Sequence, residues 1–394
     1  MSTSSERRRA FTGPIVFSHG FRPFFLVAGI WAALALLIWT VTLATGNDVP
    51  SQMTGADWHM HEMVFGYSSA VIAGFLLTAV PNWTGRLPVV GWPVAGLTGI
   101  WVAGRLALYT SEYLSVFLAP LIDISFLLVL GIVIAREVIS GKNWRNLKVL
   151  VIVLLLALAN IVFHIEAANG SAYSGYGVRL GIGTIVFLIT LIGGRVIPSF
   201  TRNWMVRSGI QKLPTPMNRF DSIALAFGGM AIVAWVIMPE LTIVRLLNLI
   251  AGGLHLVRVA RWSGWRTLAE PLVMILHATY LFIPIGFLML ALGDLVPGWS
   301  GPLQIPHAWM VGAIGGMTLA MMTRVSLGHS GRILQSSRAI VAIYLAFLVA
   351  AVFRIASEMF VAADYLLYIS ATGWILAFAG FVVVYFPILT QPKK

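Results

Sequence analysis

Histidine is the residue type best suited to chemistry in this 394-residue chain, because neutral imidazole is the commonest nitrogen ligand for copper, zinc and haem iron. The eight histidines divide into two groups by their place in the predicted helices. The group expected near the outer membrane face is His59, His61, His164 and His307. The group expected near the inner face is His19, His255, His277 and His329. This division predicts two places where a metal or a haem is bound.

The densest run of candidate ligands is Trp58-His59-Met60-His61-Glu62-Met63. A lone interfacial histidine more often only forms hydrogen bonds, but two imidazoles and a carboxylate at one helix start favour metal ligation. His59 and Glu62 are three positions apart and are expected to share a helix face, with His61 pointing elsewhere. One histidine then binds haem and the other copper, or one of them only orients a partner. For His19 and His329, in short loops, ligation and hydrogen bonding are equally compatible with the sequence.

The acidic residues near the outer histidines are Glu62 and Glu166, whereas Asp123 lies deeper, in the middle of a predicted helix. A carboxyl group removed from water can exchange protons, so Glu62 is the candidate catalytic proton donor. The alternative is a hydrogen bond or an ion pair with an arginine such as Arg105 or Arg179. For Asp123 this alternative is preferred.

A candidate anion site lies further along the chain, around Arg324, Arg332 and the turn at 328–331. Guanidinium groups bind carboxylates and phosphates in bidentate fashion. We expect Arg324 to contact haem propionates or, alternatively, lipid phosphates.

The elements that position these residues must be membrane helices. Hydrophobic residues make up 59% of the chain and charged residues only 10%, against roughly 25% in soluble domains. The chain has no cysteine, which excludes disulfides, thiolate-held iron–sulfur clusters, covalent haem attachment and thiolate-ligated copper. Any metal must therefore be held by histidine, carboxylate or methionine. The phosphate-binding pattern Gly-x-x-x-x-Gly-Lys is missing from the sequence, which makes ATP-driven transport an unfavourable hypothesis.

A transmembrane helix needs about 20 mostly apolar residues. Runs of this kind are predicted at 21–44, 60–80, 89–109, 114–138, 147–169, 177–198, 219–238, 240–260, 270–292, 303–325, 338–361 and 364–388. The sequence thus predicts an all-α, polytopic integral membrane protein of about twelve spans, forming a single transmembrane domain over 1–394. The break at Pro239 predicts either a tight hairpin or one kinked segment.

The basic residues predict the orientation of these spans. Lys and Arg are enriched in cytoplasmic loops. Here most of the 26 fall in alternate loops, and the longest loops of the other set, 45–59 and 293–302, have none. Both termini are therefore expected in the cytoplasm, with 1–20 as a cytoplasmic N-terminal segment. The same distribution accounts for the net charge of +12 without a nucleic-acid partner.

Several separated motifs carry a family resemblance. They are Ser18–Phe25, Trp58–Met63, Ala79–Gly85, Gly193–Thr201 and His307–Gly331. In this order they resemble the NnrS family over nearly the whole chain. The resemblance implies a protein of the bacterial inner membrane that takes part in nitric oxide metabolism or tolerance and carries haem b and copper. It does not assign either cofactor to particular histidines.

Twelve helices with candidate ligands on the second and tenth also resemble the haem–copper oxidase and nitric oxide reductase catalytic subunits. Those enzymes take ligands for the second metal from helices six and seven, where this sequence has no histidine. If the architecture is distantly shared, His59 and His164 must replace them. The analogy extends to fold only.

The leading hypothesis is reduction of nitric oxide to nitrous oxide at the outer histidines, with protons passed by Glu62. The inner group, His255 and His277 with His19 and His329, would then hold a second haem or admit electrons from a quinol. The alternative is a non-catalytic protein that binds nitric oxide or metal and protects iron centres from nitrosylation. A transporter is a third hypothesis, which the position of the polar groups near the membrane faces disfavours.

Overall fold

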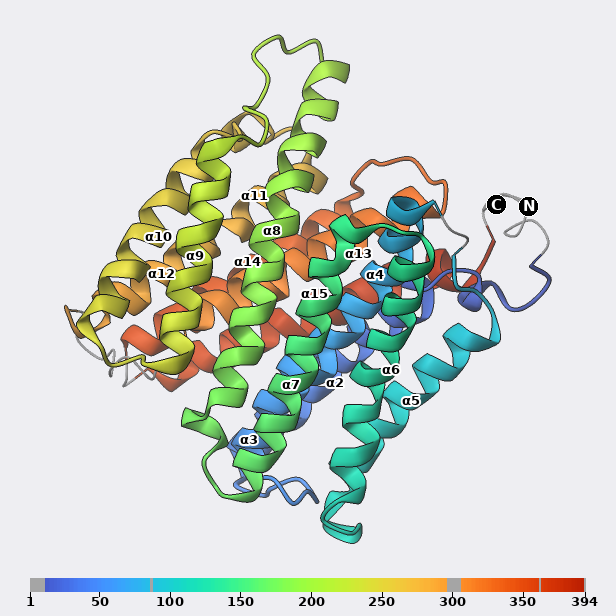
Figure 1. Cartoon of the computed structure of the whole chain (residues 1–394), viewed down its shortest axis with the longest axis vertical. Coiled ribbons are helices and arrows are strands. Elements are labelled where there is room, and N and C mark those ends of the chain that lie inside the picture. The colour runs from blue at the N-terminus through green and yellow to red at the C-terminus, as the bar shows by residue number, and fades with distance from the viewer. Residues whose placement is uncertain (1–10, 86–87, 296–305, 361–362, 393–394) are drawn as a thin grey trace. The chain divides into compact units, whose positions relative to one another are not determined.

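The computed structural model describes residues 11–85, 88–295, 306–360 and 363–392, and in these residues every regular element is a helix. Eleven helices of the described part are long and apolar enough to cross a membrane. The chain is therefore an all-α, polytopic membrane protein, as the sequence predicts. In Figure 1 the colour runs from blue at the N-terminus to red at the C-terminus, so that the order of the helices can be followed.

The helices begin and end within a few residues of the predicted spans, except that the fourth and tenth spans begin somewhat later and the sixth continues to Arg207. The long helices are α2 (Phe21–Thr45), α4 (Ser68–Thr84), α5 (Trp92–Tyr109), α6 (Leu118–Ser140), α7 (Leu147–Ala168), α8 (Tyr176–Arg207), α9 (Arg219–Ile237), α10 (Thr242–Ala260), α13 (Gly316–His329), α14 (Arg338–Met359) and α15 (Asp364–Thr390). Shorter pieces are α3 (Gly55–His61), α11 (Pro271–Tyr280), α12 (Phe282–Leu292) and the π-helices η2 (Glu62–Tyr67) and η8 (Ala308–Gly315). The 3₁₀ turns are Ile15–Phe17, Ser111–Tyr113, Trp144–Asn146, Ala172–Ser174, Gly264–Arg266 and Gly293–Leu295.

Helix α5 is the predicted span that does not belong to the eleven. It carries Arg105 among apolar residues, and this arginine lowers the mean hydropathy of the helix. Its side chain is nevertheless buried, at 3% exposure. The cationic group is thus directed into protein rather than lipid, the usual arrangement for an ionisable residue at membrane depth.

The break at Pro239 separates two helices that pack against each other, α9 and α10. Helix α9 begins with a capping box in which Asn218 accepts from the backbone of the first turn and Asp221 accepts from the Asn218 N–H. This arrangement satisfies backbone donors that would otherwise lack partners. Of the two alternatives left by the sequence, the tight hairpin is the one observed.

The chain divides into two compact units, whose boundaries fall inside α8, α13 and α15 and in the segment between α13 and α14. Unit 1 comprises 1–181, 325–333 and 378–394; in it α4 packs on α2 and α6, and α6 also packs on α5 and α7. Unit 2 comprises 182–324 and 334–377, where α10 packs on α9 and α12, and η8 on α12 and α14.

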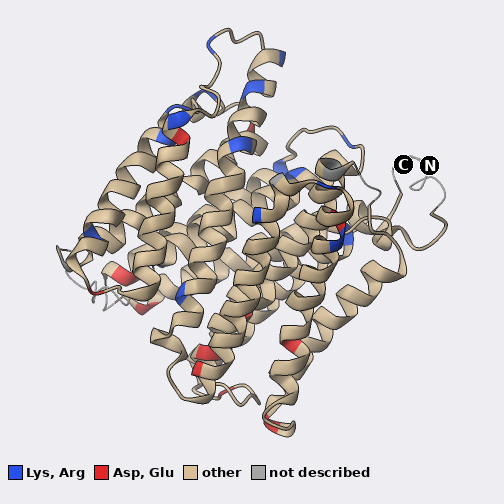
Figure 2. Ribbon diagram, in the orientation of Figure 1, with Lys and Arg blue, Asp and Glu red and all other residues tan. Residues whose placement is uncertain are grey.

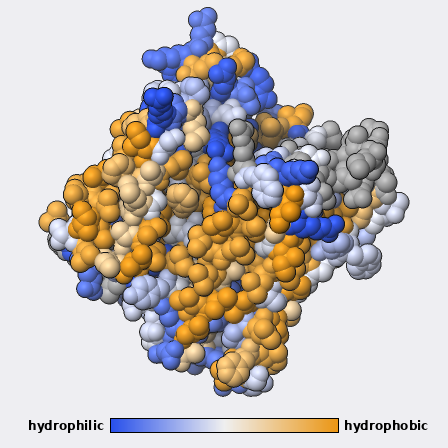
Figure 3. Space-filling view, in the orientation of Figure 1, coloured by the Kyte–Doolittle hydropathy of each residue, from blue (hydrophilic) through white to orange (hydrophobic). Residues whose placement is uncertain are grey.

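The outer surface of unit 2 is suited to lipid. Helices α9 and α10 expose large apolar side chains, visible as the orange surface of Figure 3. They include Ile223, Met230, Val233, Leu246 and Leu249. Lys and Arg instead gather at the end of this unit where α8 stops and α9 begins (Figure 2).

Both π-helices of the described chain begin directly after a histidine. His61 precedes η2 and His307 precedes η8, and in each case a glycine follows five residues later, Gly66 or Gly312. A π-turn inserts one residue into a helical turn and is frequently found at functional sites. Each of the two units therefore contains a π-helix that directly follows a histidine.

A buried candidate metal centre

Two histidines and an aspartate meet inside unit 1. They are His61 at the end of α3, Asp123 in α6 and His164 near the end of α7. The Asp123 Oδ2 atom lies 3.1 Å from His61 Nε2 and 3.0 Å from His164 Nε2. One ligand atom from each residue lies within 4.8 Å of the others, and all three side chains are buried. We call this set the His–Asp–His cluster.

Asn160, one turn before His164 in α7, completes the contacts of the cluster. Its Oδ1 lies 2.9 Å from His61 Nε2, and its Nδ2 donates to Asp123 Oδ2 at 2.7 Å. Asn160 therefore holds both His61 and Asp123 in place, as outer partners of metal ligands commonly do.

Glu62 and Arg105 extend the cluster into an ionic network. Arg105 donates to Glu62 Oε2 at 3.0 Å and also to Asp123 Oδ1. Trp31 Nε1 donates to the same Glu62 oxygen at 2.6 Å, and Glu62 Oε1 lies 3.2 Å from His61 Nδ1. Two buried carboxylates thus share one guanidinium, which offsets their removal from water.

Glycines allow this network to assemble. A Cβ added to Gly66 in η2 would lie 2.6 Å from Glu62 Oε2 and closer still to Arg105. A Cβ added to Gly104 would lie 3.2 Å from the Asp123 Cα, so this glycine lets α5 approach α6. The guanidinium of the next residue, Arg105, can then reach Asp123.

The donor set fits a single metal ion. A tetrahedral ion with bonds of 2.0–2.1 Å keeps its donors about 3.3 Å apart, close to the spacing of the imidazole nitrogens from Asp123. Both His61 nitrogens face oxygen acceptors, although a neutral imidazole has only one N–H. The ring is cationic, or one of the facing carboxyl groups is protonated and donates to it, or a cation lies at one nitrogen. Two imidazoles and a carboxylate suit copper, zinc or iron.

The same pair does not fit haem with two axial histidines. Such a haem lies between its imidazoles, one on each face of the porphyrin. The His61 and His164 ring centroids are only 4.9 Å apart, with an interplanar angle of 48°. No porphyrin can lie between them.

The other predicted ligands of unit 1 lie outside this cluster. His59 stacks on Trp39, with ring centroids 5.0 Å apart and an angle of 10°. The Glu62 carboxylate, which the sequence expects on the same helix face as His59, contacts the adjacent residue where the π-helix begins, with Oε1 3.2 Å from His61 Nδ1. His19 and His329 both contact Phe21, at centroid distances of 5.5 and 6.0 Å.

In unit 2 the predicted ligands have partners of their own. His255 Nδ1 lies 3.2 Å from the Tyr280 hydroxyl, and its ring stacks on Phe287. His277 Nε2 lies 2.8 Å from the Thr201 hydroxyl. These histidines stay candidate haem ligands.

His307, in the same unit, contacts a glutamate and an arginine. Its Nδ1 pairs with Glu358, and its Nε2 lies 2.8 Å from Arg354 Nη2. His307 and His61 therefore both precede a π-helix and both contact a glutamate.

Sequence reasoning treated Asp123 as an ordinary ion-pair residue and passed over Asn160. The ion pair with Arg105 is present, but Asp123 also joins both histidines. A carboxylate in the middle of an apolar helix is the feature that identifies it, because such groups in membranes are usually functional. Asn160, a lone amide among apolar residues of α7, carries the same indication.

These features define a class: a multi-pass, all-α membrane protein with a buried His–Asp–His group that can bind a metal. A model of the family described as NnrS protein matches residues 15–393, nearly the whole chain. The chain belongs to this family, which confirms the resemblance seen in its motifs. No curated protein matches the sequence.

Proposed function

We propose that the protein binds copper at the His–Asp–His cluster and reduces nitric oxide to nitrous oxide in the bacterial inner membrane. The convergence of His61, Asp123 and His164 carries this proposal. Membership of the NnrS family supports nitric oxide as the substrate. The reaction combines two nitric oxide molecules with two electrons and two protons to give nitrous oxide and water, with a quinol as the electron donor.

Bound copper, with haem b ligated by other histidines, would bind nitric oxide and transfer electrons to it. The chain itself controls protons and water. His61 Nδ1 lies 3.2 Å from Glu62 Oε1, within reach of proton exchange between imidazole and carboxyl. Trp31 and Arg105 orient the Glu62 carboxylate. Glu62 as proton donor is part of the proposal.

Aromatic side chains make the surroundings of His61 apolar. The rings of Phe65 and Phe163 lie 5.3 and 5.5 Å from the His61 ring, measured between centroids. Apolar side chains of this kind exclude bulk water, which strengthens electrostatic interactions inside the site.

The test is an anaerobic optical spectrum and metal analysis of the detergent-purified protein, before and after addition of nitric oxide and a reduced quinol. We expect haem bands, bound copper and consumption of nitric oxide over many turnovers. Protein that contains neither haem nor metal would refute the proposal and return attention to transport.

A second function, non-catalytic binding that protects iron centres, is favoured by one observation. His61, Asp123 and His164 are all buried, so a metal bound there would be enclosed by protein side chains. Binding of nitric oxide once, without turnover, would establish this function instead.

A further inference from the structure

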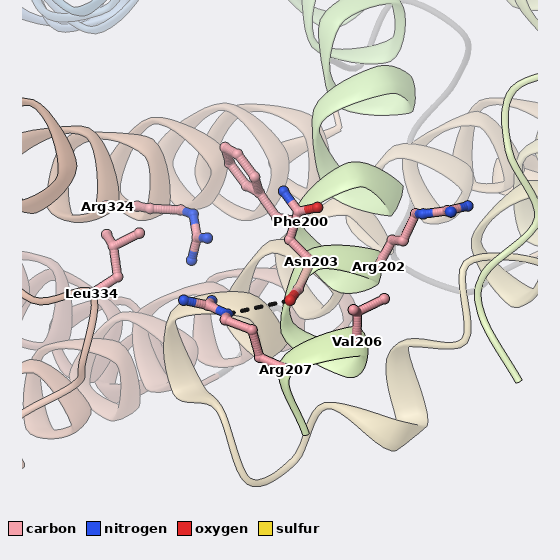
Figure 4. A pocket seen from close by; sticks show the side chains of 7 residues that line it. All are labelled: Phe200, Arg202, Asn203, Val206, Arg207, Arg324 and Leu334. Atoms are coloured by element: carbon pink, nitrogen blue, oxygen red, sulfur yellow. Dashed lines mark hydrogen bonds between the residues drawn. The ribbon is translucent and has the colours of Figure 1, made fainter. Parts of the chain in front are cut away.

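A basic cavity lies in unit 2, apart from the histidines discussed so far. Its volume is about 600 Å³, within the range of small-molecule sites. It is lined by Phe200, Arg202, Asn203, Val206, Arg207, Arg324 and Leu334, which are drawn in Figure 4. Three lining residues are arginines and none is acidic.

Arg324 is the buried member of this set. Its side chain is only 6% exposed, and its guanidinium stacks on Phe200, with the Cζ atom 4.0 Å from the ring centroid. Within the described residues, no hydrogen bond or ion pair reaches the Arg324 guanidinium. The five N–H donors of this guanidinium are therefore available to a ligand in the cavity that Arg324 lines.

Arg207 faces the same cavity from α8. Its Nε donates to the Asn203 carbonyl at 3.2 Å. Figure 4 shows the Arg207 and Arg324 guanidinium groups directed toward one another. Two cations in this arrangement repel each other unless an anion lies between them.

The acidic group that acts on Arg324 does not fill this role. Glu270 attracts Arg324 electrostatically, but no ion pair within 4.0 Å joins them in the described chain. The Glu270 carboxylate instead accepts the Leu272 N–H at 3.2 Å and caps α11. The cavity therefore retains its positive charge.

The position of the cavity along α8 indicates where its ligand is found. Helix α8 has 32 residues, about 48 Å at 1.5 Å per residue, and exceeds a hydrocarbon core of about 30 Å. The cavity lies on its last two turns, at the end of unit 2 where Lys and Arg gather, as they do in loops at a membrane surface. Phosphate groups of lipids, and phosphate dissolved in water, are both present at that level.

We infer that this cavity binds a phosphate group between Arg207 and Arg324, with Arg202 at its edge. Guanidinium groups match phosphate oxygens in bidentate geometry. The phosphate belongs to an anionic lipid headgroup or is free phosphate. This inference is independent of the proposed reaction with nitric oxide.

The experiment measures binding of inorganic phosphate and of short-chain phosphatidylglycerol to the purified full-length protein in detergent. Arg324→Gln and Arg207→Gln are each expected to weaken binding at least about tenfold, the loss typical of a charge-assisted hydrogen bond. Arg207 is exposed, so its variant keeps the test valid if Arg324→Gln fails to fold. Arg219→Gln is the matched control, an exposed arginine of the same unit outside the cavity.

Tighter binding of phosphatidylglycerol than of phosphate would identify a lipid headgroup, and the reverse order would identify free phosphate. Either result, with Arg219→Gln unchanged, supports the site. If the wild-type protein bound neither phosphate nor phosphatidylglycerol, the inference would be overturned. Equally weaker phosphate binding in all three variants would also overturn the inference. So would a wild-type protein that binds no phosphate and an Arg324→Gln variant that loses haem, because Arg324 would then bind haem propionates.

Discussion

At the scale of single residues, Asp123 is the centre of the candidate site. One of its carboxylate oxygens contacts both His61 and His164, while the other pairs with Arg105. A carboxylate that joins two imidazoles resembles a metal ligand more than an ordinary partner of arginine. Contact with Asp123 therefore distinguishes His61 and His164, the candidate metal ligands, from the other histidines.

His164→Gln should release the metal. The substitution removes one of three donors and retains a polar side chain, so we expect metal affinity to fall by more than the 10–100-fold typical of an outer partner. Metal content after dialysis against a chelator measures this. His59→Gln is the matched control, because His59 stacks on Trp39 outside the cluster. Equal metal loss in both variants would contradict the assignment.

Asn160→Ala tests positioning. Asn160 contacts His61 and Asp123 and offers only an amide, so we expect about 10–100-fold weaker metal binding with ligation retained. A metal titration that follows the ligand-field spectrum separates weaker binding from lost ligation. An unaltered affinity would show that the cluster needs no outer support.

Arg105→Met should destabilise unit 1. It leaves the Glu62 and Asp123 carboxylates buried without their shared cation, at a cost of about 3–5 kcal/mol. Thermal unfolding in detergent measures the loss, and a second substitution, Glu62→Gln, should recover part of it. Arg136→Met is the control, because Arg136 is exposed on α6. Similar unfolding of both variants would show that the ionic network adds nothing.

At the scale of elements, hydropathy is sufficient to predict the helices. The α9–α10 hairpin and the long α14 follow from runs of apolar residues and their breaks, because lipid requires every backbone group to be paired within a helix. The approach of α6 to α3 and α7 is another matter. It depends on how the α6–α7 pair packs against α3, which lies far from both in the sequence, and no local pattern at Asp123 or Asn160 encodes this packing.

The π-turns show the same limit on a smaller scale. The equal spacing of His61 to Gly66 and His307 to Gly312 is visible in the sequence, but a regular helix was expected at both places. The contact of Glu62 Oε1 with His61 Nδ1, at 3.2 Å, joins adjacent residues. Helical periodicity pairs residues three or four positions apart and could not predict this contact.

Gly66→Ala should disturb the turn that holds Glu62. The added methyl group meets Glu62 and Arg105, and overpacking of this kind costs about 1–3 kcal/mol. We expect a lower unfolding temperature together with weaker metal binding. Gly96→Ala, in the same unit, adds its methyl group to open space and should be neutral or stabilising by up to about 1 kcal/mol. If Gly66→Ala left the unfolding temperature and metal binding as little changed as Gly96→Ala does, η2 would be shown to accommodate an added methyl group.

At the scale of the whole molecule, α5 decides the topology. Eleven spans would place the two termini on opposite sides of the membrane, whereas a twelfth span at α5 places them on the same side. The basic loops favour twelve, because the alternation of Lys and Arg holds only if α5 crosses. Burial of Arg105 inside unit 1 removes the objection that a charged helix cannot span.

The lack of cysteine allows a direct test of this topology, because a single introduced thiol is the only one present. Thiols at three exposed loop positions, Asn47→Cys, Glu112→Cys and Ser171→Cys, should react in intact cells with a reagent that cannot cross the membrane. Thiols at Lys142→Cys and Gln211→Cys should react only after the cells are opened. If α5 does not cross the membrane, the thiol of Glu112→Cys should not react in intact cells. The reactivity of every later position would then be reversed. The orientation of the basic cavity in unit 2 would then be reversed as well, so that its phosphate would come from the periplasmic side.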